Sequence, residues 1–303
     1  SYNATSNKYV VSTLGHLSFI AQNTSFWSKN FIQTANIDAT VTKFWDDADD
    51  AGGVSGDRYN DNNDLTSAGN NEGFFPIGNN PTFFTGEYDG GGYSINNLTI
   101  KRASTSHVGF FRESKLATIK NLSLTNVNIT GGFSTGSLGG VLRKTIIDNC
   151  TASGSVSGTE WVGGLVGYSH ISGIVSNSYS TVSVSGSSRY VGGLVGFIYA
   201  GRILNSYSTG SVETTHSDRG GLVGKISSSY VIDSFYDSQT SGQSDSGKGT
   251  GKTTAEMKTL ATFTNTATAG LSTSWDFNDI WRISGSINGG YPYLNYDHSY
   301  ESL

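Results

Sequence analysis

The sequence is poor in the residues on which several protein classes depend. It has a single cysteine, Cys150, among 303 residues, which excludes an internal disulfide framework and any metal site built from several cysteines. Charged residues make up only 14% and aromatic residues 12%, a balance that excludes a disordered chain. The 40 glycines follow no Gly-X-Y period, which excludes collagen. No apolar run approaches the roughly 20 residues of a membrane span.

An excess of basic charge is also missing. The 19 Lys and Arg residues are outnumbered by 24 Asp and Glu, for a net charge of −5, so nothing favours a nucleic-acid partner. The opening SYNATSNKYVV has neither the basic nor the apolar region of a signal peptide. We therefore expect a mature segment or an excised piece of a larger surface protein. The low charge, the abundant Gly, Ser and Thr and the lone thiol favour an extracellular or cell-surface location.

What the sequence does contain is a repeat of about 28 residues. The segment GGLVG begins at Gly163, Gly192 and Gly220, at intervals of 29 and 28 residues. Two further columns keep this period. One is a polar anchor every 28 residues, at Asn121, Asn149, Asn177, Asn205 and Asp233, and the other is an aromatic residue two positions later, at Tyr179, Tyr207 and Phe235. Three columns with one period indicate stacked, nearly identical units.

The segments within each repeat are short, β-branched and partly alternating, and Gly-Gly or Ser-Gly pairs separate them. A coil of two or three such strands cannot bury its apolar side alone, but it can do so by stacking on identical coils about 4.8 Å away. Stacking places Asn on Asn and ring on ring, while Leu and Val of GGLVG fill the interior. A leucine-rich repeat would need L-x-x-L-x-L, which is absent. The sequence therefore predicts an all-β fold, a right-handed parallel β-helix or β-solenoid.

Short helices are expected to cap both ends of this β-helix. Thr13 is placed to N-cap a first helix, and Thr253-x-x-Glu256 forms a capping box ahead of a last one. We expect one structural domain with four parts: an N-terminal cap of a helix plus a strand (1–45), an acidic inserted loop (46–72), the parallel β-helix repeats (73–243), and a connector, helix and C-terminal cap (244–303).

The GGLVG segments, with the S-Y-S-T-G-S-V that follows, resemble the GLUG-motif repeats. The stretch Phe74–Ile100 is similar to the opening segment of proteins with such repeats, and Phe235–Phe263, followed by Trp275–Leu294, looks like their closing segment. The resemblance implies a bacterial or archaeal surface protein, adhesin-like in character. GLUG repeats are also found beside IgA-specific metallopeptidase domains. The five histidines here form no H-E-x-x-H motif, so that activity is not carried over.

The most unusual stretch, 46–64, holds seven aspartates and one arginine. Oxygen-rich loops with glycines suit Ca²⁺, and Asp57, Asp61 and Asp64 form the best-spaced trio of metal ligands. The EF-hand pattern fails, because neither its sixth-position glycine nor its twelfth-position Glu is present. A solvated acidic loop remains the alternative to a calcium site.

Aromatic residues recur around the GGLVG segments. We expect them to line one face and to stack on sugars; the alternative is that about half of them serve interior packing. The predicted function is a non-catalytic, extracellular, adhesin-like β-solenoid that presents a binding surface for carbohydrate or another cell surface. Its candidate ligand-binding residues are Trp161, Tyr168, Tyr190, Phe197 and Tyr199.

Two alternatives remain open. A β-helical polysaccharide lyase or glycoside hydrolase would need paired carboxylates, yet the repeats contain few acids and no Asp-Asp pair. Glu160 and Arg189 are expected to meet on adjacent coils, where a salt bridge explains them equally well. An ice-binding face would need long Thr columns, but Thr181 and Thr209 form only a short, interrupted one. No catalytic residue is assigned.

Overall fold

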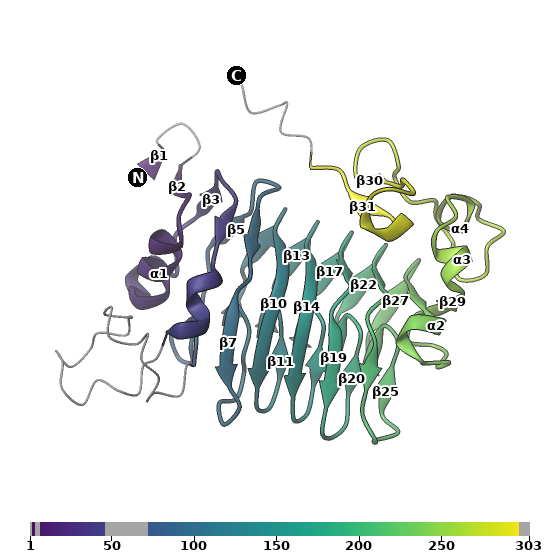
Figure 1. The fold of residues 1–303 in the computed structure, drawn as a ribbon, viewed down its shortest axis with the longest axis horizontal. Helices are drawn as coiled ribbons and strands as arrows, with labels where there is room; N and C mark the ends of the chain where they lie inside the picture. The colour runs from purple at the N-terminus through teal and green to yellow at the C-terminus, as the bar shows by residue number, and fades with distance from the viewer. Residues whose placement is uncertain (1, 4–6, 46–71, 297–303) are drawn as a thin grey trace.

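The computed structural model describes residues 2–3, 7–45 and 72–296, and these form stacked coils of mostly parallel β-strands (Figure 1). The structure confirms the parallel β-helix. A complete coil contributes strands to four sheets rather than the two or three strands that the sequence predicted. In one coil these strands are β13 (Ile146–Asp148), β14 (Thr151–Gly158), β15 (Val162–Gly163) and β16 (Val166–His170).

Sheets A and B form the two longest walls of the solenoid. Apart from β13, sheet A runs through β1 (Tyr2–Asn3), β2 (Lys8–Val11), β3 (Phe31–Gln33), β5 (Glu87–Asp89), β9 (Thr118–Lys120), β17 (Ile174–Ser176), β22 (Arg202–Leu204) and β27 (Tyr230–Ile232). Apart from β14, sheet B contains β4 (Ile37–Asp38), β6 (Ser94–Asn96), β7 (Thr99–Arg102), β10 (Ser123–Gly131), β18 (Tyr179–Ser180), β19 (Ser183–Gly186), β23 (Tyr207–Ser208), β24 (Val212–Glu213), β28 (Phe235–Asp237) and β29 (Thr250–Lys252).

The GGLVG segments divide between the two shorter walls, because their glycines lie at a corner. Sheet D takes the first glycine, in β11 (Thr135–Gly136), β15, β20 (Val191–Gly192) and β25 (Arg219–Gly220). Sheet C begins at the following valine. Its strands are β8 (Phe111–Lys115), β12 (Gly139–Arg143), β16, β21 (Val195–Tyr199) and β26 (Val223–Ser227).

The predicted anchor residues lie in single file between sheets A and B. Asp148 pairs in register with Ser176, so Asn149 and Asn177 follow at the same level of adjacent coils. All five anchors, from Asn121 to Asp233, have positive φ, between 46° and 52°. Asn and Asp tolerate this left-handed conformation better than other L-residues. Only Asn149 donates to the anchor below it, to Asn121 at 3.3 Å, so the corner geometry explains the column better than an amide ladder does.

The interior is filled as the sequence predicted. Leu165, Leu194 and Leu222 are fully buried, as are the valines that follow them. The paired glycines let adjacent coils approach each other, since a Cβ atom on Gly193 would lie 2.2 Å from the carbonyl oxygen of Gly221 on the next coil. Such contacts explain why the repeat keeps both glycines.

The two ends of the chain close the structure differently. Helix α1 (Leu14–Gln22) lies at the N-terminal end of the solenoid, and the Thr13 hydroxyl accepts a hydrogen bond from the backbone N–H of His16 at 3.2 Å (Figure 1). At the other end are the short helices α2 (Ser238–Ser241), α3 (Thr254–Met257), with its predicted capping box, and α4 (Ala261–Thr264).

The last described segment, residues 271–296, turns back along the outside of sheet B. It contains the hairpin of β30 (Trp281–Arg282) and β31 (Tyr293–Leu294). Tyr207 of the aromatic column lies in a hydrophobic cluster with Trp275 and Trp281, separate from the solenoid interior. The end of the chain therefore covers the aromatic column from the side, where the sequence predicted only a cap that plugs or flanks the end.

Asp233 holds this C-terminal cover in place. Its carboxylate accepts hydrogen bonds from the Ser272 hydroxyl at 2.9 Å and from the Thr273 N–H at 3.1 Å, as well as from the Ser272 N–H. The Trp275 indole donates to the Asp233 carbonyl oxygen at 2.9 Å. An acceptor-only side chain suits this role, which explains why the last anchor is Asp rather than Asn.

Replacement of Gly193 by Ala should lower the free energy of unfolding by about 1–3 kcal/mol, because the added methyl group forces adjacent coils apart. Gly285→Ala is the matched control, since a Cβ at Gly285 meets nothing within 4 Å. Urea unfolding followed by circular dichroism measures both variants. Equal stability of the two would contradict the close-approach argument.

Replacement of Asp233 by Asn should loosen the C-terminal cover while leaving the coils intact. Asn keeps the tolerance for positive φ but loses one acceptor oxygen and the negative charge, at a cost of about 1.5–3 kcal/mol. Limited proteolysis should cut residues 271–296 sooner in the variant, with an unchanged far-ultraviolet spectrum. Cleavage at the wild-type rate would show that Asp233 does not secure this segment.

Candidate functional site

The sequence-predicted aromatic residues gather on the outer face of sheet C and the corner beside it. Ser169 and Ile198 point into the buried interior, so their neighbours Tyr168 and Phe197 point outward. The Tyr168 and Phe197 rings stack at 4.9 Å between centroids with 6° between their planes, because the two residues are register partners on β16 and β21.

Two corner residues extend this stack. Trp161 and Tyr190 have φ of 56° and 63° at the turns into β15 and β20, which directs their side chains toward sheet C. The Trp161 ring lies 4.6 Å from Tyr168 and 5.5 Å from Phe197, while Tyr190 lies 5.4 Å from Phe197. We call Trp161, Tyr168, Tyr190 and Phe197, together with Phe133, the aromatic platform.

Phe133 was missed by the sequence reasoning. Its ring lies 4.0 Å from Trp161, but no aromatic residue occupies the matching place in the next coils, so no periodic signal marked it. Tyr199, the fifth predicted residue, lies beside the platform and contacts it through His170, whose ring is 5.7 Å away. None of the five predicted residues belongs to the buried core, so the alternative of interior packing does not hold for this set.

The rim of the platform is charged. Arg189 and Glu160 form the predicted salt bridge between coils, with Nε and Oε1 3.1 Å apart. The Arg189 guanidinium lies 5.3 Å and the Lys225 ammonium 5.8 Å from the centre of the Tyr190 ring, which are cation–π distances.

A more deeply buried charge lies at the N-terminal side of the same sheet. Glu113 is only 3% exposed, and its carboxylate lies 3.0 Å from Nδ1 of His107 and 3.3 Å from Nη1 of Arg143. Burial disfavours its ionisation, but the His107 hydrogen bond and the charges of Arg143 and Arg112 outweigh burial and lower the pKa of Glu113. Glu113 is therefore an ionised partner of its neighbours rather than a proton donor.

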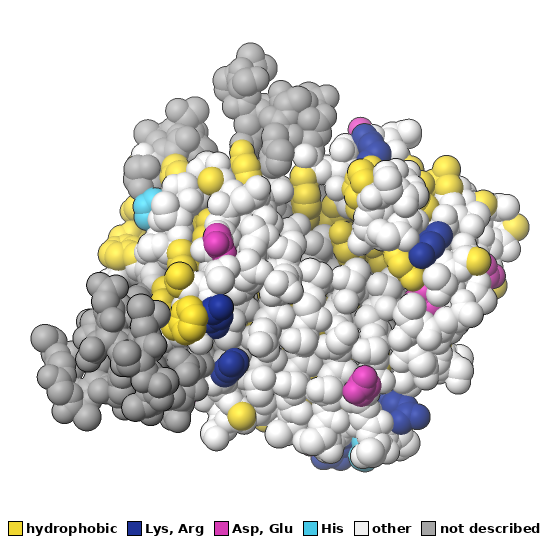
Figure 2. All heavy atoms as spheres, viewed as in Figure 1, with side chains coloured by type: hydrophobic (Ala, Val, Ile, Leu, Met, Phe, Trp, Pro, Cys, Tyr) yellow, Lys and Arg dark blue, Asp and Glu magenta, His cyan; other side chains and the backbone are white. Residues whose placement is uncertain are grey.

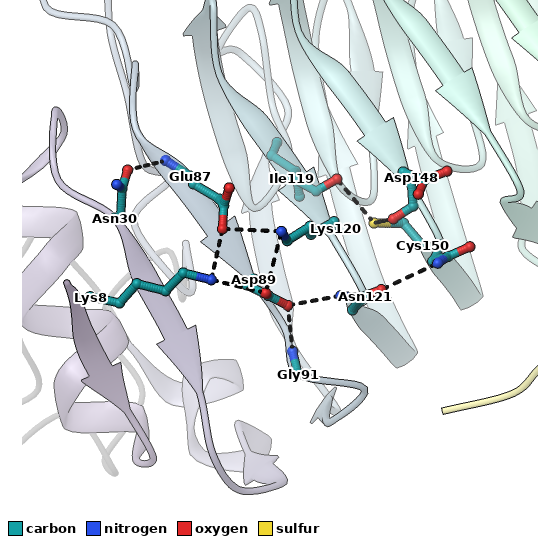
Figure 3. Close-up of polar contacts among 11 residues, drawn as sticks. Lys8, Asn30, Glu87, Asp89, Gly91, Ile119, Lys120, Asn121, Asp148 and Cys150 are labelled. Atoms are coloured by element: carbon teal, nitrogen blue, oxygen red, sulfur yellow. Dashed lines mark hydrogen bonds and ion pairs between the residues drawn. The ribbon is translucent and has the colours of Figure 1, made fainter. Parts of the chain in front are cut away.

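Two further carboxylates lie close together on sheet A. Lys8 Nζ binds both Glu87 and Asp89, at 2.8 and 3.1 Å, and Lys120 approaches both as well (Figure 3). Burial works against ionisation of Asp89, yet hydrogen bonds from Asn121 and Gly91 and the charge of Lys8 lower its pKa. The pKa of Glu87 is lowered in the same way by its two lysines.

The remaining sequence predictions concern metal binding and membrane crossing. The calcium candidates Asp57, Asp61 and Asp64 lie outside the described residues. Across residues 2–3, 7–45 and 72–296, no group of three or more His, Cys, Asp or Glu side chains is arranged to hold a metal ion. Within the same ranges no helix has the length and apolarity to cross a membrane.

Sheet B carries polar surfaces without such rings. Figure 2 shows a face over β10 and β14 on which charged side chains are sparse. A groove of about 860 Å³ near α2 is lined chiefly by Ser, Thr, Gly and Gln, with Glu213 and Arg219 as its charged residues. Thr209, from the proposed ice-binding column, is 9% exposed, and its carbonyl accepts a hydrogen bond from Thr240.

The stacked coils, the left-handed corners and the paired glycines define a β-solenoid repeat protein. The sequence profile of the GLUG motif matches residues 159–185 and 187–213, which contain two of the GGLVG segments. The chain therefore contains GLUG-motif repeats, as its sequence predicted.

Known proteins resemble different lengths of the chain. Halomucin of Haloquadratum walsbyi is 33% identical over 183 residues, 58% of this chain and 2% of halomucin. A protein of Evansella cellulosilytica described as a Gly-rich membrane protein is 35% identical over 124 residues, 40% of this chain and 10% of that protein. The chain thus matches only a small fraction of either relative.

A solved structure shares the fold. The crystal structure of a protein from Bacteroides ovatus described as an immunoglobulin A1 protease aligns with a TM-score of 0.65 over 96% of this chain and 93% of that one. The two sequences are 17% identical, so this likeness extends to the fold alone.

The Lys8–Glu87–Asp89–Lys120 network should make stability depend on acid. Because the folded-state pKa values of Glu87 and Asp89 are lowered, their contribution is full above the unfolded values of about 4 and is lost as pH falls through the folded ones. We expect Asp89→Asn to cost about 1–2 kcal/mol at neutral pH and much less at pH 2–3.

Urea unfolding at a series of pH values measures this difference. Lys8 has a raised pKa and stays charged through the neutral range, so the difference between wild type and variant should be flat there. A difference that stays constant down to the most acidic pH would contradict the assignment.

Proposed function

We propose that this chain is a non-catalytic, extracellular, adhesin-like β-solenoid whose aromatic platform binds carbohydrate. The observation that carries the proposal is the contiguous set of partly exposed rings around the stacked Tyr168–Phe197 pair. The rings offer apolar surface to the C–H groups of pyranose sugars, and the tyrosine hydroxyl offers a hydrogen bond. Rigid strands hold these rings, so little conformational entropy is lost when a sugar binds.

The surface location rests on two supports. The relatives include a mucin by name and a protein described as a membrane protein. The chain itself is low in charge and rich in hydroxyl side chains, as expected of a solvated extracellular scaffold. The matched segments are small parts of longer proteins, so the chain would act as one presenting unit of a larger assembly.

The rival function, a polysaccharide-active enzyme, has little support in the described residues. Glycoside hydrolysis needs two carboxylates on either side of the bond, but the Glu87 and Asp89 carboxylates are both bound to Lys8. A general acid needs a raised pKa, whereas both pKa values are lowered. Two ionised carboxylates neutralised by two lysines form a structural ion-pair network.

A glycan array with the intact chain tests the proposal. We expect binding to a subset of glycans, and Tyr168→Ala should weaken that binding about tenfold, because it removes one half of the stacked pair. Tyr230→Ala is the matched control, since Tyr230 is 66% exposed on sheet A, on another wall of the solenoid.

A reducing-sugar assay on the same preparation separates binding from turnover. We expect no product from any polymer that binds. Release of reducing ends would favour the enzyme, and equal loss of binding in the Tyr168 and Tyr230 variants would remove the platform from the proposal.

A further inference from the structure

A column of basic side chains runs along the outer face of sheet C beside the platform. Lys115, Arg143 and His170 are register partners on β8, β12 and β16, and Tyr199 is the next member on β21. They lie two residues beyond Glu113, Val141, Tyr168 and Phe197 on the same strands, so they share the outward-facing side. We call Lys115, Arg143 and His170 the basic column.

The positive charge of this column is only partly neutralised. Arg143 approaches Glu113, but that carboxylate is also bound by His107, and Lys115 has no ion pair within the described part of the chain. Both cations pack over one ring, with Lys115 at 5.7 Å and Arg143 at 5.6 Å from the centre of Phe83. Like charges on neighbouring strands are unfavourable, and an anion placed between them would relieve the repulsion.

His170 connects the column with the platform. Its ring lies 4.9 Å from Tyr168 and 5.7 Å from Tyr199, and Arg143 is its register partner on the other side. Burial, followed by the charge of Arg143, lowers the pKa of His170. The imidazole is thus mainly neutral at pH 7, and a bound anion would favour its protonated form.

We propose that the aromatic platform and the basic column together bind an acidic polysaccharide, with a sugar ring on the Tyr168–Phe197 stack and its carboxylate toward Lys115, Arg143 and His170. This inference rests on the proposed function and specifies its ligand as a uronate-bearing chain. Guanidinium and ammonium groups form charge-assisted hydrogen bonds to carboxylates, and the rings supply the apolar contact. The net charge of −5 on the whole chain disfavours polyanions elsewhere, so the selection would be local.

The test compares oligogalacturonate with its methyl ester, which keeps the sugar rings but removes the charge. By calorimetry with the intact chain, the acid should bind at least about tenfold more tightly than the ester. Lys115→Gln and Arg143→Gln should each weaken binding of the acid and leave binding of the ester unchanged. Lys101→Gln, an exposed lysine on sheet B, is the matched control and should change neither.

A pH series provides a second readout. Affinity for the acid should rise between about pH 7.5 and pH 5.5, as His170 becomes protonated while the uronate stays ionised. His170→Gln should abolish this rise, which separates His170 from His107, the other histidine near the site. An unchanged pH dependence in His170→Gln would remove His170 from the site.

Three further outcomes would each contradict a different part of the proposal. If the ester binds as tightly as the acid and Tyr168→Ala weakens both, the platform binds neutral sugars and the acidic specificity is wrong. If neither binds and a glycan array is also blank, the proposed function fails with it. If inorganic polyphosphate competes fully and Tyr168→Ala has no effect, the column is a general anion patch and the proposal is overturned.

Discussion

The structure depends on the registered stacking of one coil on the next. Within the repeats, the strands of sheets A to D hydrogen-bond to their counterparts one repeat away, so each residue is fixed above the residue at the same position of the next coil. The coil can repeat this way only if its corners turn at the same place each time. The left-handed anchors from Asn121 to Asp233 and the glycine pairs of GGLVG are what set those corners.

Registered stacking also explains how a candidate binding surface arises on a scaffold. A side chain placed on the outer face of one strand acquires a neighbour about 4.8 Å away for each coil that repeats it. Tyr168 and Phe197 stack for this reason, and Lys115, Arg143 and His170 align for the same reason. Evolution of such a face requires only substitutions at outward positions, because the interior positions of the same strands maintain the fold.

The repeat made the fold predictable, whereas features outside the repeat could not be predicted. The 28-residue period predicted the parallel solenoid, its buried Leu and Val positions and the single file of anchors. It also placed Glu160 and Arg189 on adjacent coils. The number of strands per coil escaped prediction, because the corner between the GGLVG glycines and the following valine leaves no mark in hydrophobicity.

The candidate site was predicted only in part, because only some of its residues recur with the repeat. Four of the five candidate rings recur with the period and do lie together, whereas Phe133 has no counterpart in other coils. The basic column escaped notice, because its members differ in type from coil to coil. The lateral placement of the C-terminal segment depends on tertiary contacts of Trp275, Trp281 and Asp233 that no local pattern encodes.

That segment has a consequence for how many coils the protein can contain. It is fastened at Asp233 and reaches back to Asn149, whose carbonyl oxygen accepts a hydrogen bond from the Tyr296 hydroxyl at 2.8 Å. These two points are three repeats apart along the anchor column. The length of this segment therefore matches three repeats. Gain or loss of a repeat between Asn149 and Asp233 would prevent both contacts from forming together, whereas repeats added before Asn149 would leave the distance between them unaltered.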